Sequence, residues 1–320
     1  MRWFLWLKND KEMNTKILIY GAGVIGSIFA GMIARKGFDV TVLARGKRLQ
    51  ELNTNGLILV NSMNNIRTVV KLRTTDVLNE NDIYDYIIVV VQNTQIDDIL
   101  PILSKNKSSN IVFVVNNPLG YDKWIDAVGR ERIMFGFPSA GGVRKNGEVH
   151  YFIGKGIAKL FQSTTFGELD GARTGRLIHL VKIFKHAGFQ PAISKSPDAW
   201  QKTHIAVVMP AAKALYKYQS NNYELSRSYA TLKQMILSTR ECFLVLKSID
   251  VKIEPKKLNF YYLPLFVIVP AYMLLMRTKI AEVAMAEHTK VAKEEMDALE
   301  TQFLSLNTKG IELKNFMQWS

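Results

Sequence analysis

Six residues early in the chain, Gly21-Ala22-Gly23-Val24-Ile25-Gly26, have the G-x-G-x-x-G spacing of a dinucleotide-binding turn. The turn follows a short apolar segment, KILIY, and precedes a helical pattern, SIFAGMIARKG, which is the context that the motif requires. Gly21 permits the tight turn, Gly23 lets a pyrophosphate approach the backbone, and Gly26 lets the helix pack closely on the sheet. The N-terminus of that helix also offers N–H groups to phosphates. We therefore predict dinucleotide binding here, with a ligand-free glycine turn as the alternative.

The residues at the end of the second apolar segment, DVTVLA, indicate which dinucleotide binds. A site for NAD usually has an acidic residue at this position, where it binds the ribose hydroxyls. Here the chain continues LARGKR, so a 2′-phosphate would meet cations and no carboxylate. We therefore predict NADP(H) as the cofactor, with Arg45 as the first candidate and Lys47 and Arg48 beside it. A solvated basic loop is the alternative.

A single lysine, Lys202, stands near the start of an otherwise apolar helical run, SPDAWQKTHIAVVMPAAKAL. The letters SPD predict a helix start: a capping hydroxyl, a proline at the first position and an acid at the positive end of the helix dipole. The neighbours of Lys202 at helical spacing are apolar: Ile205, Ala206 and Met209. Such a lysine either snorkels to the surface or is partly desolvated, and a desolvated ammonium can give a proton to a ketone oxygen during hydride addition. Spacing alone favours snorkelling.

Other polar residues that could contact a substrate lie at a strand end and on a late helix. Asn116 and Asn117 follow the apolar segment NIVFVV, at the carboxyl edge where open α/β sheets bind ligands. Turn chemistry alone is the alternative explanation for these asparagines. His288 and Glu295 are about two helical turns apart and therefore share one helix face. His288 could bind the substrate; the alternative is that it lies on a solvent-exposed helix face.

The elements that position these residues alternate between strand and helix in the first half of the chain. YDYIIVVV and NIVFVV are continuous β-branched runs, typical of strands buried on both faces of a parallel sheet, and the helix-like TQIDDILPILSK lies between them. This alternation predicts a Rossmann-type doubly wound, mostly parallel sheet. After Ser196 helical periodicity dominates, which predicts an all-helical C-terminal domain and an α/β fold class for the whole chain.

The segments after residue 131 predict how the first domain ends. RIMFGF, GEVHYF and IAKLFQ are interpreted as antiparallel strands that extend the sheet, with Asn146-Gly147 as a hairpin turn. RLIHLVKIFKHAG is an amphipathic helix and FQPAIS a last strand. We predict a dinucleotide-binding domain over 1–195, in which 1–14 is an extension and Met13 an alternative start, and a helical substrate and dimerisation domain over 196–320.

The composition limits the classes of partner. The chain of 320 residues has 42 Lys and Arg against 28 Asp and Glu, a net charge of +14, which suits phosphate-bearing ligands, nucleic acid or an anionic membrane. The cations are scattered without a zinc-finger or RNA-binding signature, so no nucleic-acid partner is expected. The single cysteine, Cys242, excludes an internal disulfide framework and fits a cytoplasmic location. It lies in an apolar helical pattern and is expected to be buried; no metal site and no serine-hydrolase elbow are expected.

Residues 258–276, LNFYYLPLFVIVPAYMLLM, form an uncharged run that is long enough for a membrane span. Pro264 and Pro270 interrupt the run, and polar helical sequence continues on its far side. These features favour a buried core or a subunit interface over membrane contact, and an interface at this run would make the protein a homodimer.

In their order along the chain, the motifs GAGVIG, LARG, VVVQN, VVNNPLG, FGELDG and AWQKTH resemble the ketopantoate reductase family over nearly the whole sequence. The resemblance implies an NADPH-dependent reduction of a 2-oxo acid, with a small-molecule carbonyl compound as substrate. It implies that Lys202 is the catalytic lysine, that Asn117 lies near the nicotinamide and the substrate, and that Glu295 closes the active site. It also places Gln92 where the family often has a lysine near the cofactor.

The chain departs from the family at three positions that contact substrate. Ala206 and Pro210 stand where the family has two substrate-binding asparagines, and Val283 stands where it has a serine. We therefore expect reduction of a related carbonyl, with Lys202 as general acid, rather than of ketopantoate itself. The alternative is a non-catalytic NADP-binding protein that docks to a membrane or a partner through residues 258–276.

Overall fold

The computed structural model describes residues 14–154, 163–290 and 293–319. Its contacts divide the chain into two compact units. The first unit contains Met1–Val115 and Asp122–Lys195, and the second contains Ser196–Ser320 together with the short segment Asn116–Tyr121. The asparagines after the segment NIVFVV therefore pack with the helical unit, although the strand that precedes them belongs to the first.

The first unit is built on an eight-stranded sheet with the order β12-β11-β8-β7-β6-β1-β2-β5. Six of these strands are parallel to one another: β1 (Lys16–Tyr20), β2 (Asp39–Leu43), β5 (Arg73–Thr75), β6 (Tyr86–Val89), β7 (Ile111–Phe113) and β8 (Ile133–Phe137). β11 (Thr165–Glu168) is antiparallel to β8, and β12 (Ala192–Ile193) pairs with β11 at the edge. The strand order reverses between β1 and β6, which is the switch point where doubly wound sheets bind their ligands. The predicted fold class is confirmed.

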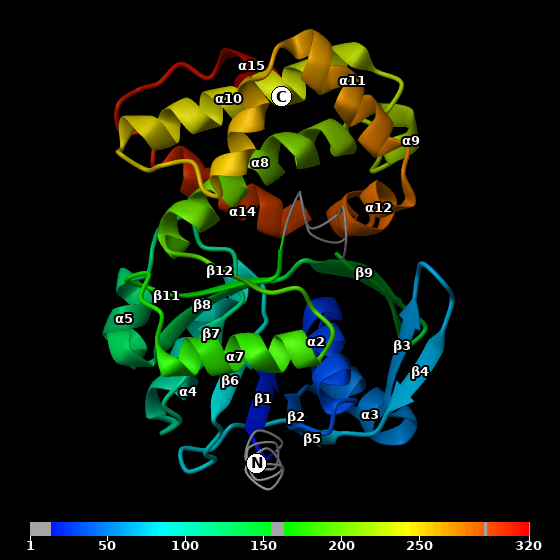
Figure 1. The fold of residues 1–320 in the computed structure, drawn as a ribbon, viewed down its shortest axis with the longest axis vertical. Helices are drawn as coiled ribbons and strands as arrows, with labels where there is room; N and C mark the ends of the chain where they lie inside the picture. Colours follow the sequence, from blue (N-terminus) through cyan, green and yellow to red (C-terminus); the bar gives the residue numbers. More distant parts are fainter. Residues whose placement is uncertain (1–13, 155–162, 291–292, 320) are drawn as a thin grey trace, which may run out of the picture. The chain divides into compact units, whose positions relative to one another are not determined.

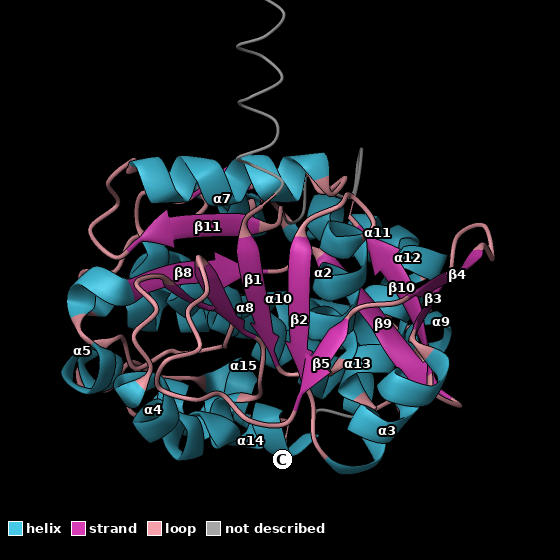
Figure 2. Cartoon of the chain, turned by 90° about the horizontal axis from the view of Figure 1, so that it is seen from below, coloured by secondary structure: helices cyan, strands magenta, loops and turns pink. Residues whose placement is uncertain are grey.

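Helices cover both faces of this sheet (Figure 2). They are α2 (Val24–Ala34), α3 (Gly46–Asn55), α4 (Ile96–Lys105), α5 (Asp122–Val128) and α7 (Gly175–His186), with short 3₁₀ turns η1 (Asn93–Gln95) and η2 (Arg130–Arg132). α2 and α7 pack together on one face, where the rings of Phe29, Phe184 and Phe189 contact one another. α4 and α5 pack together on the other face. The position of α2 fixes the glycine turn, because that turn is the connection from β1 to α2.

A second sheet of four strands packs on α2, in the order β4-β3-β10-β9 (Figure 1). Its strands are β3 (Leu57–Asn61), β4 (Arg67–Val70), β9 (Ala140–Lys145) and β10 (Glu148–Ile153). The predicted turn at Asn146-Gly147 is confirmed, because both residues have positive φ, 51° and 81°, and join β9 to β10.

Two of the strands predicted to extend the main sheet are placed differently. RIMFGF forms β8, which is parallel to β7, so the prediction of an antiparallel strand is wrong there. GEVHYF forms β10, which pairs with β3 and β9 in the second sheet rather than the first. An apolar run shows that a strand is buried, but its direction depends on the crossover through α5. The segment IAKLFQ and residues 1–13 of the predicted extension 1–14 lie outside the described residues.

The described secondary-structure elements of the second unit are all helical. Its elements are α8 (Pro197–Tyr216), α9 (Asn222–Leu225), α10 (Tyr229–Ser248), η3 (Lys256–Tyr262), α11 (Leu265–Met276), α12 (Lys279–Ala281), a π-helical turn η4 (Glu282–Ala286), α13 (Glu287–Thr289), α14 (Lys293–Leu304) and α15 (Lys314–Met317). α10 packs against α8, α11 and α15, while α14 packs against α8 (Figure 1). Cys242 on α10 is fully buried in this core, and burial raises the pKa of its thiol. It is therefore a structural thiol, as predicted.

The apolar run 258–276 is divided between η3 and α11, which bend by 112° at Leu263 and Pro264. One face of α11 is buried in the helical core through Ile268, Val269, Tyr272 and Met276. Phe266 and Leu274 lie outside that face and are 76% and 63% exposed. Among the described residues no single helix is long and apolar enough to cross a membrane, and only this bent pair passes that test together.

Candidate functional site

Two of the three glycines in the turn are required by the packing of the chain. Gly21 has a φ of 114°, and a Cβ at this position would lie 2.3 Å from the carbonyl oxygen of Val90. A Cβ on Gly26 would lie 2.0 Å from the carbonyl oxygen of Gly21, because α2 begins directly against the turn. Both residues are therefore glycine for reasons that involve no ligand.

Gly23 differs, because nothing in the fold requires a glycine there. Its φ of −66° and ψ of −169° are accessible to any residue, and an added Cβ would meet no atom within 4 Å. Gly23 is the N-cap of α2, where amide groups and the positive end of the helix dipole favour an anion. The space beside Gly23 thus fits a pyrophosphate that approaches the backbone. The side chains of the remaining residues of the turn pack on the core: Ala22, Val24 and Ile25.

The cations after β2 have different surroundings. Arg45 donates a hydrogen bond from Nη2 to the hydroxyl of Tyr20 at 3.3 Å. Burial raises the pKa of Tyr20, and the nearby Arg45 opposes that shift. Arg48 instead turns inward: it is 8% exposed and donates to the carbonyl oxygen of Ala22 at 3.3 Å and to Oγ of Ser27 at 3.1 Å. Of the three predicted cations, Arg48 therefore fastens α3 to the glycine turn, while Arg45 and Lys47 remain exposed.

Gln92 lies just after β6, beside the switch point of the sheet. It is the N-cap of η1, and its backbone N–H donates to Oε1 of Gln95 at 3.2 Å in a reciprocal capping box. The residue is exposed, and its side chain accepts from the backbone of the same turn. The structure thus gives Gln92 a capping role, and its contact with a cofactor stays a prediction.

In the second unit, Asn117 uses its side chain to close its own turn. Its Oδ1 accepts from the backbone N–H of Leu119 at 3.2 Å, and its Nδ2 donates to the carbonyl oxygen of Gly120. The neighbouring Asn116 reaches further, because its Nδ2 donates to Oε1 of Glu295 on α14 at 3.4 Å. The structure therefore joins Glu295 to Asn116 rather than to Asn117, and the described contacts of the Asn117 side chain are those of a turn.

Lys202 lies in the second turn of α8 and is held by an ion pair with Asp198. Its Nζ is 2.6 Å and 2.5 Å from the two carboxylate oxygens of Asp198, and the lysine side chain is only 12% exposed. Ser196 occupies the N-cap position, but its hydroxyl does not cap the helix, so that part of the predicted helix start is wrong. Asp198 was predicted only as a partner of the helix dipole. The i,i+4 spacing of Asp198 and Lys202 was the signal for the pair.

Asp198 also faces the segment that carries the asparagines. Burial raises the pKa of Tyr121 well above its usual value, and the carboxylate of Asp198 adds to that shift. The N-terminal turns of α8 and the segment Asn116–Tyr121 are thus neighbours within one unit. The same segment contacts α14 through Asn116, so Lys202, Asp198, Asn116 and Glu295 belong to one connected region of the helical unit.

Glu295 is a buried carboxylate near the end of α8. It is 7% exposed on α14, which packs against α8. Burial raises the pKa of Tyr216 to about 12, with smaller contributions from Asp297 and Glu295. Near the same end of α8, Lys213 forms an ion pair with Glu300 of α14 at 2.9 Å. The side chain of His288, the predicted substrate contact, lies outside the described part of the structure.

The three positions at which the resemblance implies polar substrate contacts are apolar and buried here. Ala206 is fully buried within the core of the helical unit, and Pro210 is buried inside α8. Val283 is 6% exposed and lies in the π-helical turn η4, a type of distortion that is frequent at functional sites. These positions offer no hydrogen bond from a side chain to a substrate.

Two further observations concern His204 and metal ligands. His204 stacks on Trp200, with ring centroids 5.6 Å apart and an interplanar angle of 14°, so it packs locally. Across residues 14–154, 163–290 and 293–319, no three His, Cys, Asp or Glu side chains are grouped so as to hold a metal ion.

Comparison with known proteins gives a match to a family model described as "Ketopantoate reductase PanE/ApbA" over residues 17–170. The chain is 26% identical over 226 residues to the 2-dehydropantoate 2-reductase of Pyrococcus horikoshii. The aligned segment covers 68% of this chain and 71% of that protein. Curated relatives match over between 58% and 71% of their own length.

Solved structures share the fold over nearly the whole chain. The 2-dehydropantoate 2-reductase from Geobacter metallireducens has a TM-score of 0.74 at 18% identity and covers 95% of this chain and 97% of its own. A ternary structure of D-mandelate dehydrogenase with NADH and anilino(oxo)acetate has a TM-score of 0.71 at 17% identity, covering 95% and 96%. The family match includes the glycine turn and extends through β11, and the shared fold continues through the helical unit. The chain therefore matches the ketopantoate reductase family in sequence over residues 17–170 and in fold over nearly its whole length.

Proposed function

We propose that the protein is an NADPH-dependent oxidoreductase that reduces a 2-oxo acid or a related carbonyl compound to the hydroxy compound. The observation that carries the proposal is Gly23, a glycine that the fold does not need, at a helix N-terminus where a pyrophosphate fits. The family match supports the same reading of this turn. When bound, the cofactor supplies the hydride.

In this proposal, residues of the helical unit donate the proton and bind the substrate. Lys202 is proposed as the general acid, because an ammonium both stabilises the developing alkoxide and can donate a proton to it. Asp198 holds the Nζ of Lys202 in place through both of its carboxylate oxygens. Glu295, with Asn116 donating to it, is proposed to bind a polar group of the substrate.

The substrate is proposed to be a 2-oxo acid with an apolar side chain. Ala206, Pro210 and Val283 remove the polar contacts that a hydroxylated side chain would need. The D-mandelate dehydrogenase of similar fold was solved with an aromatic oxoacetate, which is a ligand of this kind. The preference for NADPH over NADH is supported by Arg45 and Lys47, which follow β2 without an acidic neighbour.

Titration of the full-length protein with NADPH and with NADH tests the function at its first step. We expect NADPH to bind in the micromolar range or tighter and to raise the thermal midpoint, because a ligand that binds only the folded state stabilises it. NADPH oxidation should then follow the addition of aromatic and branched 2-oxo acids in preference to ketopantoate. Absence of both a binding signal and a thermal shift with either dinucleotide would exclude the proposal.

A second copy of the chain is proposed to cover the exposed apolar residues of α11. The double substitution Phe266→Ser with Leu274→Ser removes apolar surface without touching the buried face of that helix. We expect the wild-type protein to sediment at twice its 36.4 kDa mass and the double variant to sediment as a monomer with an unchanged helix content. Co-sedimentation of a wild-type monomer with anionic vesicles would instead support the non-catalytic docking alternative.

A further inference from the structure

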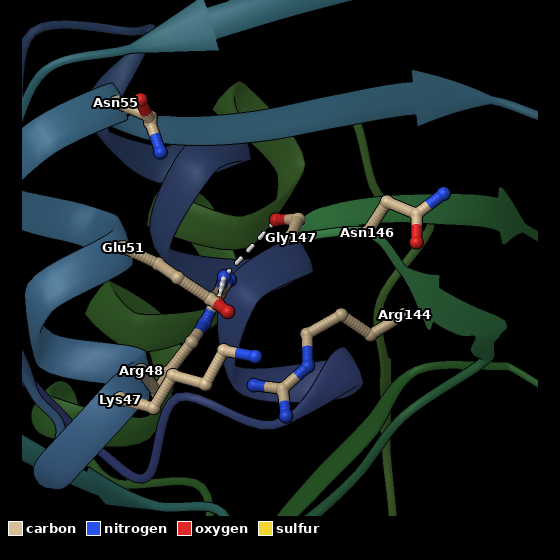
Figure 3. Close-up of a pocket in the computed structure, with 7 residues that line it drawn as sticks. All are labelled: Lys47, Arg48, Glu51, Asn55, Arg144, Asn146 and Gly147. Atoms are coloured by element: carbon tan, nitrogen blue, oxygen red, sulfur yellow. Dashed lines mark hydrogen bonds and ion pairs between the residues drawn. The ribbon is translucent and has the colours of Figure 1, made fainter.

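A pocket lies in the first unit between α3 and the hairpin of β9 and β10 (Figure 3). Its cavity volume of about 470 Å³ is within the range of small-molecule sites, roughly 300–1,000 Å³. The residues that line it come from two segments that are almost one hundred positions apart in sequence: Lys47, Arg48, Glu51, Asn55, Arg144, Asn146 and Gly147. Three of the seven are cations and one is an acid. The pocket therefore suits an anion.

Arg48 lines this pocket and already donates most of its N–H groups to protein atoms. Its Nη1 donates to the carbonyl oxygen of Gly147 at 3.1 Å and to Oε2 of Glu51 at 3.1 Å. Its other groups donate to the glycine turn and to α2. The single carboxylate of the pocket, that of Glu51, is thus neutralised by Arg48 rather than by the cations at the rim.

Arg144 and Lys47 are the two cations that remain available to a ligand. Both are exposed, and Figure 3 shows both side chains beside Arg48. Among the described residues no carboxylate forms an ion pair with either of them. Burial lowers the pKa of Arg48, and the charge of Arg144 lowers it further, so the positive charges of the pocket repel one another. A bound dianion would relieve this repulsion.

The position of the pocket indicates which dianion it receives. Lys47 follows β2 by four residues, at the strand end where dinucleotide-binding sheets contact the adenosine ribose. Arg48 joins the pocket directly to the glycine turn through the carbonyl oxygen of Ala22. A dinucleotide bound at that turn would carry its 2′ substituent toward this strand end.

We propose that Arg144, supplied by the second sheet, completes with Lys47 a binding site for a phosphomonoester dianion, the 2′-phosphate of NADP(H). This inference rests on the proposed function, since it names the group that the first unit recognises. Arg144 is then a specificity-determining residue, and the hairpin with the turn Asn146-Gly147 is the element that presents it. A free inorganic phosphate has the same chemistry and is the other ligand to be distinguished.

The test measures the dissociation constants of NADPH, NADH and inorganic phosphate by calorimetry on the full-length wild type and on Arg144→Gln. We expect the substitution to weaken NADPH binding about tenfold or more, because a charge-assisted hydrogen bond to phosphate is lost, and to change NADH binding less than about twofold. Arg144→Lys should lie between the two, since it keeps the charge and loses the planar fork. The exposed position of Arg144 predicts an unchanged thermal midpoint.

Lys145→Gln is the matched control, because it removes one positive charge from the adjacent residue, whose side chain points to the opposite face of β9. It should leave NADPH binding within about twofold of wild type. Equal losses in both variants would mean that only net charge matters, and tight NADPH binding that Arg144→Gln does not weaken would overturn the site. Phosphate that binds the wild type and does not compete with NADPH would overturn the assignment to the 2′-phosphate. A wild type that binds neither dinucleotide would instead refute the proposed function, and the assignment with it.

Discussion

Replacing Lys202 by alanine is expected to lower turnover by about two to four powers of ten, the scale of a lost general acid. The affinity for NADPH should stay within about twofold of wild type, because Lys202 lies in the helical unit and the glycine turn in the other. The side chain of Lys202 is only 12% exposed and its Nζ is fixed by Asp198, so the ammonium is held in one place rather than extended into solvent. Steady-state kinetics and calorimetry measure the two effects separately.

The same helix offers a control for that substitution. Lys213 is also a partly buried lysine of α8, and its Nζ forms an ion pair with Glu300 at 2.9 Å. Lys213→Ala should lower the thermal midpoint as Lys202→Ala does, yet leave turnover near wild type. If both variants lost activity equally, the loss would come from the stability of α8, and if Lys202→Ala kept full turnover, the lysine would have no catalytic role. Asp198→Asn should give an intermediate loss of turnover, since it leaves the ammonium in place and removes its anchor.

The substitution Gly23→Ala is expected to abolish most dinucleotide binding while the protein remains as stable as wild type. The added methyl group meets no protein atom and suits the extended backbone at this residue, so the folded state accommodates it and the unfolded chain loses freedom. A bound pyrophosphate would be pushed away from the amides of α2, and each charge-assisted hydrogen bond that is lost costs about 1.5–3 kcal/mol. We expect NADPH affinity to fall by at least about tenfold, measured by calorimetry beside a thermal melt.

The other two glycines of the turn give the opposite pattern. In Gly26→Ala the new Cβ would lie 2.0 Å from the carbonyl oxygen of Gly21, and overpacking of this kind typically costs 1–3 kcal/mol or more. Gly21→Ala adds the strain of a positive φ. Both variants should melt at lower temperature with or without ligand. Wild-type NADPH affinity in Gly23→Ala would show that no phosphate approaches the backbone there.

Local sequence patterns determined the first unit in outline. The glycine spacing between a strand and a helix predicted the turn, because Gly21 is required by its own positive φ and Gly26 by its contact with Gly21 five positions earlier. The β-branched runs predicted β6 and β7 for the same reason, since burial on both faces leaves a continuous apolar segment. The positive φ values of Asn146 and Gly147 are likewise a property of the dipeptide.

The direction of a strand and its pairing partner could not be predicted from local sequence patterns. β8 was expected to be antiparallel and is parallel, and β10 was assigned to the main sheet but pairs with β3 in another. Hydrophobic alternation records which face of a strand is buried, whereas the partner depends on where the connecting helix returns the chain.

For the candidate site, the sequence by itself determined the residues whose role is local: the glycine turn, the cations after β2 and Lys202 in the second turn of α8. Only the tertiary structure decided which of these side chains are exposed to a ligand and which other residues they contact. It turned Arg48 inward to fasten the turn, brought Arg144 from the second sheet beside Lys47, and joined Asn116 to Glu295 across 179 positions of sequence. Helical periodicity gives a side chain its face on an element, but the neighbour on that face is selected by the packing of elements that are distant in sequence.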